Sequence, residues 1–193
     1  IAVILTMIFG GFLFLSMGKN PFEAIKLIFW DPIMSPTFSE YSRPQLVIKA
    51  APLILIALGL SFGFRANIWN IGAEGQYIMG ALFSGSIGLA LYPLDAWFIF
   101  PLMILGGIIG GIFWAMIPAI LKIKFNTNEI LVSLMLVYVA EQILALASVG
   151  FLRNPEGLGF PGSRDLSKYP SASNPELIAN SGIHVGVICS FIA

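Results

Sequence analysis

Charged side chains are scarce in this chain. Lysine, arginine, aspartate and glutamate together make up 10% of its 193 residues, whereas 58% of the residues are hydrophobic. A soluble domain typically carries about 25% charged residues. Here the charges lie between apolar runs of about 20 residues, which is the length of a helix that crosses about 30 Å of hydrocarbon. The composition therefore excludes an ordinary soluble domain and predicts an all-α, polytopic transmembrane helical bundle.

The residues that support metal, redox and hydrolytic chemistry are also nearly absent. The chain has one cysteine, Cys189, and one histidine, His184, so a disulfide framework or a thiolate metal cluster is excluded. We expect Cys189 to be a small packing residue and His184 an interfacial side chain. No P-loop, zinc-protease or nucleophile-elbow motif occurs. We therefore expect no catalytic residue, metal or cofactor, and the zero net charge gives no basis for nucleic-acid binding.

The apolar runs predict about six membrane spans within a single transmembrane domain, residues 1–193. The first run begins at Ile1 and the last stops at Ala193, both inside apolar sequence, so we expect a fragment whose first and last spans are incomplete and whose C-terminal part is missing. The predicted spans are Ile1–Met17, Gln45–Phe62, Gln76–Leu91, Trp97–Leu121, Ile130–Gly150 and the residues from Gly182 onward.

Two polar connections carry local structural signals. Pro21–Trp30 predicts a short helix on the membrane surface, because proline suits a first helical turn and the apolar residues share one face. Lys122–Glu129 predicts a short polar hairpin. Its Asn128 is expected to cap the following helix, with the Glu129 carboxylate in the first turn.

The basic residues of the short connections predict the orientation. Arg65 and Lys122 fall on the same side of the predicted bundle, and an excess of Lys and Arg marks the cytoplasmic side. Residues 151–181, which are rich in Pro, Gly and Ser, are then expected to form an extracytoplasmic loop.

The chain is organised around Phe64–Ala81, which reads FRANIWNIGAEGQYIMGA. Its charged and amide groups lie at the edge of hydrocarbon, where lipid offers no hydrogen bonds. Its glycines allow backbone bending or close approach. One interpretation is a broken or tightly packed element beside a cavity, and the alternative is a plain cytosolic loop. The candidate side chains are Asn67, Asn70, Glu74 and Gln76.

Glycines at a spacing of four predict close helix packing in two further places. One is a single pair in the second span, and the other is the motif GGIIGG in the fourth span, which contains two overlapping GxxxG pairs. These residues are Gly59, Gly63, Gly106, Gly107, Gly110 and Gly111.

Glu141 is the ionisable residue that the sequence places deepest in the membrane. Counting from Ile130 at about 1.5 Å per residue puts it roughly 16 Å into the fifth span. An ionisable group at that depth must face protein or a wet cavity. Glu141 is therefore a candidate for the solute path, and the alternatives are a helix–helix hydrogen bond or a shallower position.

The run ALGLSFGFRANIWNIGAEGQYIMGA (Ala57–Ala81) resembles the inner-membrane permease subunits of bacterial ABC importers, in the branch that carries nucleosides and simple sugars. This branch is related to ribose and branched-chain amino acid permeases. The resemblance extends through Lys49–Leu60, Phe125–Leu136 and Arg153–Ser163. Relatives often have an asparagine where this chain has Val137. The resemblance implies that the following residues line or brace the translocation region: Asn67, Asn70, Glu74, Gln76, Asn126, Asn128 and Glu129.

The resemblance also implies partners and a mechanism. The chain would be a transport subunit rather than an enzyme, since a separate cytoplasmic ATP-binding subunit hydrolyses ATP. A second permease subunit, identical or different, and an extracytoplasmic solute-binding protein would complete the importer in the bacterial cytoplasmic membrane. The family's docking helix for the ATP-binding subunit is expected beyond residue 193. Two other classes stay open, namely an ion-coupled secondary transporter that uses Glu141 or Glu74, and a non-transporting membrane scaffold.

Overall fold

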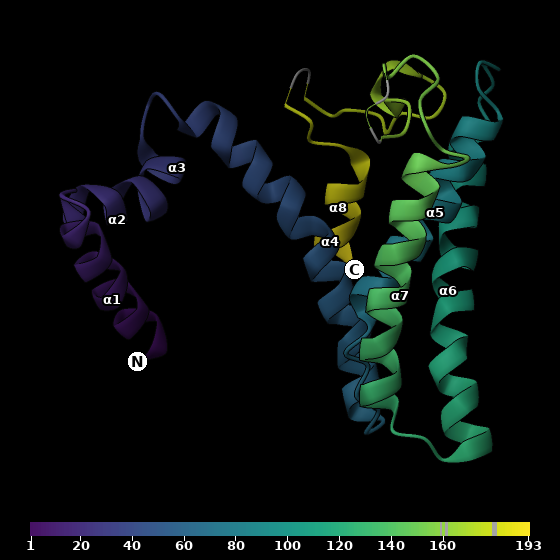
Figure 1. The fold of residues 1–193 in the computed structure, drawn as a ribbon. Helices are drawn as coiled ribbons and strands as arrows, with labels where there is room; N and C mark the ends of the chain where they lie inside the picture. Colours follow the sequence, from purple (N-terminus) through teal and green to yellow (C-terminus); the bar gives the residue numbers. More distant parts are fainter. Residues whose placement is uncertain (159, 161, 179–180) are drawn as a thin grey trace. The chain divides into compact units, whose positions relative to one another are not determined.

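The computed structural model describes residues 1–158, 160, 162–178 and 181–193, and it is built from helices (Figure 1). Within these described residues there is no β-strand, and the extended pairing is limited to two isolated bridges, Arg153–Ser163 and Glu176–His184. The all-α prediction is therefore confirmed. The chain forms two compact units. The first comprises residues 1–54 and 175–193, and the second comprises residues 55–174.

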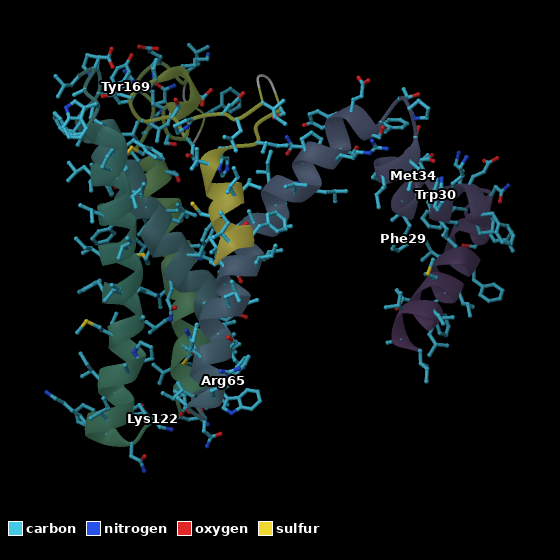
Figure 2. The ribbon with its side chains drawn as sticks, turned by 180° about the vertical axis from the view of Figure 1, so that it is seen from behind. Phe29, Trp30, Met34, Arg65, Lys122 and Tyr169 are labelled. Carbon is cyan, nitrogen blue, oxygen red and sulfur yellow. The ribbon has the colours of Figure 1, made fainter. Side chains whose placement is uncertain are left out.

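The first unit contains α1 (Ala2–Ser16), α2 (Pro21–Phe29), α3 (Asp31–Met34), the beginning of α4 (Ser39–Arg65) and α8 (Val185–Ile192). Helix α2 packs on α1. It begins where the Asn20 side chain accepts a hydrogen bond from the Phe22 backbone N–H at 3.0 Å, with Pro21 in the first turn. Figure 2 shows Phe29, Trp30 and Met34 near the junction of α2 and α3. The helix predicted at Pro21–Trp30 is thus present, while its membrane-surface location stays a prediction.

The second unit contains the end of α4, together with α5 (Ala73–Ala90), α6 (Ile99–Phe125) and α7 (Glu129–Val149). Helix α5 packs against both α6 and α7 (Figure 1). The centre of this packing is a cluster of Met79, Trp114 and Ala140, one residue from each of the three helices, and all three are buried.

Among the described residues, three helices are long and apolar enough to cross a membrane, namely α4, α6 and α7. Helix α1 has 15 residues, α8 has eight, and α5 has 18 residues with Glu74 and Gln76 near its start. The multi-pass character predicted from the composition is supported by these helices. The full set of six spans stays a prediction.

Several predicted boundaries require correction. The second span was expected at Gln45–Phe62, but α4 begins at Ser39 and continues to Arg65, so polar residues on either side of the apolar run are helical too. The expected hairpin at Lys122–Glu129 is shorter than predicted, because α6 continues to Phe125. The length of an apolar run predicts how much of a helix lies in lipid. The ends of the helix itself are set by the capping of its backbone groups, so they can lie in polar sequence beyond the run.

The loop after α7 folds back onto the α5–α6 turn. It includes the short 3₁₀ helix η1 (Leu166–Lys168). Tyr169 is buried against Ile99 and Met103 of α6, and its phenol O–H lies within hydrogen-bond distance of the Leu91 and Leu94 carbonyls. Burial raises the pKa of Tyr169, with smaller contributions from Asp95 and Tyr92. The phenol therefore stays protonated at neutral pH and remains a donor.

A second polar contact holds the same loop in place. The Ser171 hydroxyl donates to the Asp95 carboxylate and accepts from the Ala96 backbone N–H at 3.2 Å. Arg164 adds a cation–π contact, with its Cζ 4.4 Å from the centroid of the Tyr92 ring. The described part of the loop between α7 and residue 174 is thus an ordered cap on one end of the second unit.

Candidate functional site

The predicted site residues of the α4–α5 connection and the α6–α7 turn lie at the opposite end of the second unit from this cap. Figure 2 shows Arg65 and Lys122 at one end of the helices and Tyr169 at the other. At the Lys122 end, the connection between α4 and α5 (residues 66–72) lines one cavity together with the end of α6 and the start of α7. The two sequence motifs that carried the family resemblance therefore lie at one place in the fold.

The α6–α7 turn is specified by asparagines and by an ion pair. Helix α6 ends where Asn126 adopts the left-handed conformation, with φ of 51°, which asparagine tolerates better than most residues. The Asn128 side chain accepts from the Ile130 backbone N–H at 3.0 Å, so the predicted cap is present. The Lys122 ammonium lies 2.5 Å from the Glu129 carboxylate across the turn, with both groups only partly exposed. This pair ties the end of α6 to the start of α7.

The α4–α5 connection is held by Asn70. Its amide nitrogen donates to the Gln76 side-chain oxygen at 3.2 Å, and its own side-chain oxygen accepts from the Gly72 backbone N–H at 3.2 Å. Asn70 is half-buried. Asn67, earlier in the connection, is exposed and has φ of 56°. One side chain therefore fixes both the loop and its junction with the first turn of α5.

Glycines bring this connection into direct backbone contact with α7. A Cβ added at Gly72 would lie 2.4 Å from the Ser133 carbonyl oxygen, and one at Gly75 would lie 3.1 Å from the Val137 Cα. Ser133 and Val137 are both buried. Val137 stands where the resemblance implies an asparagine, and here it is a packing residue beneath α5. The start of α5 can therefore lie this close to α7 only because it has no side chains at these positions.

A cavity of about 200 Å³ lies among these elements. The connection before α5 forms one wall and the ends of α6 and α7 form the others. Most of its surface is apolar, with a few polar groups, as is typical of small-molecule sites. The polar lining residues are Asn70, Gln76, Lys122, Glu129 and Ser133, and the apolar ones are Ile68, Trp69, Ala115, Pro118, Ala119 and Ile123.

The structure thus brings together some of the predicted site residues and not others. Asn70, Gln76 and Glu129 border the cavity. Asn67, Asn126 and Asn128 belong to the two turns beside it, and Glu74 is exposed in the first turn of α5. Glu141 lies twelve residues beyond the start of α7 and is exposed, so it is separate from this cluster.

The glycine motif of α6 faces α5. Gly106 and Gly110 are buried, and a Cβ at Gly110 would lie 2.9 Å from the Met79 carbonyl oxygen. A Cβ at Gly107 would lie 3.4 Å from the Gly80 carbonyl oxygen, and one at Gly111 would lie 3.6 Å from the Gln76 carbonyl oxygen. This geometry is that of a close helix crossing.

The glycine pair of α4 is arranged differently. An added Cβ at Gly59 would meet no described atom within 4 Å, and one at Gly63 would meet only the Ile68 carbonyl of the adjoining turn, at 3.3 Å. A packing role for Gly59 and Gly63 against another helix stays a prediction. Cys189, expected to be a packing residue, is exposed on α8.

Sequence reasoning missed two contributors to the site. It used Lys122 for orientation only, although a lysine in the last turn of one helix and a glutamate seven residues later can meet across a short turn. Ser133 was missed entirely, because a single serine in an apolar helix gives no signal of which neighbour it contacts. Here its backbone and Cβ face Gly72.

Apolar helices of membrane-crossing length, with a largely apolar cavity that a few polar groups line at one end, are the features of a multi-pass membrane protein. Residues 43–192 match the family described as branched-chain amino acid transport system / permease component. The chain belongs to this family. Its members are transport components rather than enzymes, and the resemblance inferred from the sequence is confirmed.

The names of similar relatives specify different solutes. A glucose ABC transporter permease protein of Haloferax volcanii is 32% identical over 167 residues, which are 86% of this chain and 42% of the relative. A guanosine ABC transporter permease protein of Bacillus subtilis is 31% identical over 141 residues, 72% of this chain and 39% of the relative. A nucleoside ABC transporter permease protein of Lactococcus lactis is 26% identical over 202 residues, 100% of this chain and 53% of the relative.

The chain therefore spans about half the length of these relatives or less. No solved structure matches it.

Proposed function

We propose that this chain is part of a permease subunit of an ABC importer. The importer moves a nucleoside or simple sugar across the bacterial cytoplasmic membrane. The family match over residues 43–192 carries the proposal. The relatives named for glucose, guanosine and nucleosides favour this class of solute. The cavity that joins the NIGAEGQ and NTNEI segments adds geometric support.

In this proposal α1 and α4–α8 are six spans of a single permease domain, residues 1–193, with 151–181 as an extracytoplasmic loop. A second permease subunit, identical or different, pairs with it. An extracytoplasmic binding protein delivers the solute, and a cytoplasmic ATP-binding subunit supplies the energy.

Alternating access needs elements that move as rigid bodies, and the packing suggests which they are. Helices α5 and α6 meet through glycine backbones, so they are expected to move together. The Lys122–Glu129 pair joins α6 to α7 at the proposed cytoplasmic end. The residues proposed to line or brace the path are Asn67, Asn70, Glu74, Gln76, Asn126, Asn128, Glu129 and Glu141.

The energy source separates this proposal from its main rival. The exposed position of Glu141 within a membrane-length helix also fits an ion-coupled secondary transporter, in which that carboxylate would carry the proton. We expect uptake into cells or vesicles to be inhibited by vanadate and to persist when an uncoupler collapses the proton gradient. Uptake that the uncoupler abolishes and vanadate leaves intact would favour the rival. Unaltered solute fluxes on deletion of the protein would favour a scaffold.

The orientation predicts a specific labelling pattern. The native Cys189 is exposed, so the experiment starts from a Cys189→Ala background. Ser163→Cys, in the loop, should react with an impermeant maleimide in intact cells. Phe125→Cys, which is 70% exposed at the end of α6, should react only after lysis. This pair leaves Arg65 and Lys122 unchanged, and reversed labelling would contradict the orientation.

A further inference from the structure

Helix α7 carries a second polar feature that is separate from the cavity. Tyr138, Glu141 and Gln142 are all exposed. Glu141 lies twelve residues after the start of α7 and eight before its end, which is about 18 Å and about 12 Å along the helix axis. The three side chains therefore belong to the middle of a helix of membrane-spanning length, where a polar group is costly unless it has a polar partner.

The three residues share one side of α7. Glu141 follows Tyr138 by three positions and Gln142 follows it by four, so both side chains are helical neighbours of the tyrosine. The residues of α7 that are buried, and so face its neighbouring helices, are Ser133, Val137, Ala140 and Ala147. An aromatic ring, a carboxylate and an amide are thus grouped on a side of the helix that α5 and α6 leave open.

The polar groups of this side have no partner within the described part of the second unit, residues 55–174. Neither the Glu141 carboxylate nor the Gln142 amide forms a hydrogen bond or ion pair there. The other polar side chains of α7 behave differently. Ser133 and Ser148 bond back to the carbonyls of Ile130 and Leu144 on their own helix. An ionised glutamate carboxylate only accepts hydrogen bonds, so it cannot bond to a backbone carbonyl of its own helix. A hydrogen-bond donor for Glu141 must therefore come from outside α7.

We propose that this side of α7 contacts the solute during passage, and that Glu141 binds a pair of neighbouring hydroxyl groups. This inference rests on the proposed function. A carboxylate has two oxygens that accept hydrogen bonds, which matches the two O–H donors of a vicinal diol. Gln142 can both donate and accept. The Tyr138 ring offers a flat face to a sugar ring or a base.

The same diol occurs in both solute classes under consideration. A ribonucleoside carries it on carbons 2′ and 3′, and a hexose carries it on adjacent ring carbons. Removing one hydroxyl leaves one carboxylate oxygen without its donor, and a site built to hydrogen-bond a substrate hydroxyl discriminates strongly against the analogue that lacks it. The proposal therefore predicts selectivity for the hydroxyl pair, whichever compound supplies it.

The test compares a ribonucleoside with its 2′-deoxy analogue. The assembled importer, with its binding protein and ATP-binding subunit, is reconstituted in vesicles. Its ATP-dependent uptake is then measured for a ribonucleoside, for its 2′-deoxy form, which has no vicinal diol, and for a hexose, which has several. We expect Glu141→Gln to lower uptake of the diol-bearing solute about tenfold or more and to leave the deoxy analogue within about twofold. For each importer, wild-type and Glu141→Gln, the selectivity ratio is uptake of the ribonucleoside divided by uptake of its deoxy analogue. Both importers use the same binding protein, so its own preference cancels when the two ratios are compared.

Two further variants separate solute contact from helix packing. Tyr138→Phe keeps the ring and should retain uptake, whereas Tyr138→Ala should reduce it without lowering the yield of the complex. Val149→Ala changes an exposed residue at the last position of α7, eight residues and about 12 Å along the helix from Glu141, and it should be silent in both measurements.

Each remaining outcome has a definite meaning. Equal loss for both analogues in Glu141→Gln, or a lower yield of the complex, would assign Glu141 to a protein contact and overturn this inference. Unchanged uptake of both analogues would overturn it as well. If the wild-type importer shows no ATP-dependent uptake of either solute class, the proposed function fails, and this result is distinguishable from the variant results.

Discussion

Gly110→Ala is expected to destabilise the protein, although alanine is the better helix former. The new Cβ would lie 2.9 Å from the Met79 carbonyl oxygen and 2.7 Å from Cγ of Phe83. The first of these atoms belongs to the backbone of α5, so α5 and α6 would have to move apart. Overpacking of this kind typically costs about 1–3 kcal/mol. That exceeds the gain of up to about 1 kcal/mol that alanine gives over glycine inside a helix.

Two other glycines of the chain provide matched controls. An added Cβ at Gly106 would approach Cδ1 of Ile87 at 2.2 Å, but that atom is the end of a flexible side chain and can rotate away. At Gly59 the Cβ would meet no described atom within 4 Å. The expected order of stability is therefore Gly59→Ala, then Gly106→Ala, then Gly110→Ala. The measurement is thermal unfolding of the purified protein in one detergent, and equal stability of all three variants would contradict a close crossing at Gly110.

The packing of α6 shows what sequence can predict. GGIIGG marks a face where two helices can approach, because the spacing of small residues needs no knowledge of the partner. Asn128 was likewise predictable as a cap, since a helix start is a local feature. The partner helix was not predictable, and the structure identifies it as α5 through Met79, Gly80 and Phe83.

The contacts that sequence could not predict join residues far apart in the chain. Tyr169 lies 78 residues from Leu91, whose carbonyl it contacts, and Gly72 lies 61 residues from Ser133. No periodicity encodes such pairs. The extent of α4 was also missed, because the polar residues from Ser39 carry no hydrophobic signal although they are helical. In the site, the candidates were predicted by residue type, and their grouping around one cavity required the fold.

Asn70→Leu is expected to reduce uptake to background while the protein still inserts in the membrane. The leucine has a similar size but offers neither the donor that meets Gln76 nor the acceptor that meets Gly72. The α4–α5 connection would lose both side-chain contacts at once, and the Gln76 oxygen would lose its partner beside the cavity. Each unmade buried hydrogen bond typically costs about 1–3 kcal/mol. The apolar spans that drive insertion are untouched, so membrane content measured by immunoblot should stay near the wild-type level.

Asn70→Asp distinguishes a loss of hydrogen bonds from a general intolerance of substitution. Aspartate keeps an acceptor for the Gly72 N–H, and the Gln76 amide can rotate so that its nitrogen donates to the second carboxylate oxygen. Both contacts survive, at the cost of one added charge near Glu129. Measurable uptake by Asn70→Asp together with background uptake by Asn70→Leu would therefore assign the role to these two bonds. Normal uptake by Asn70→Leu would instead favour a plain cytosolic loop, because such a loop needs neither contact to leave the solute path intact.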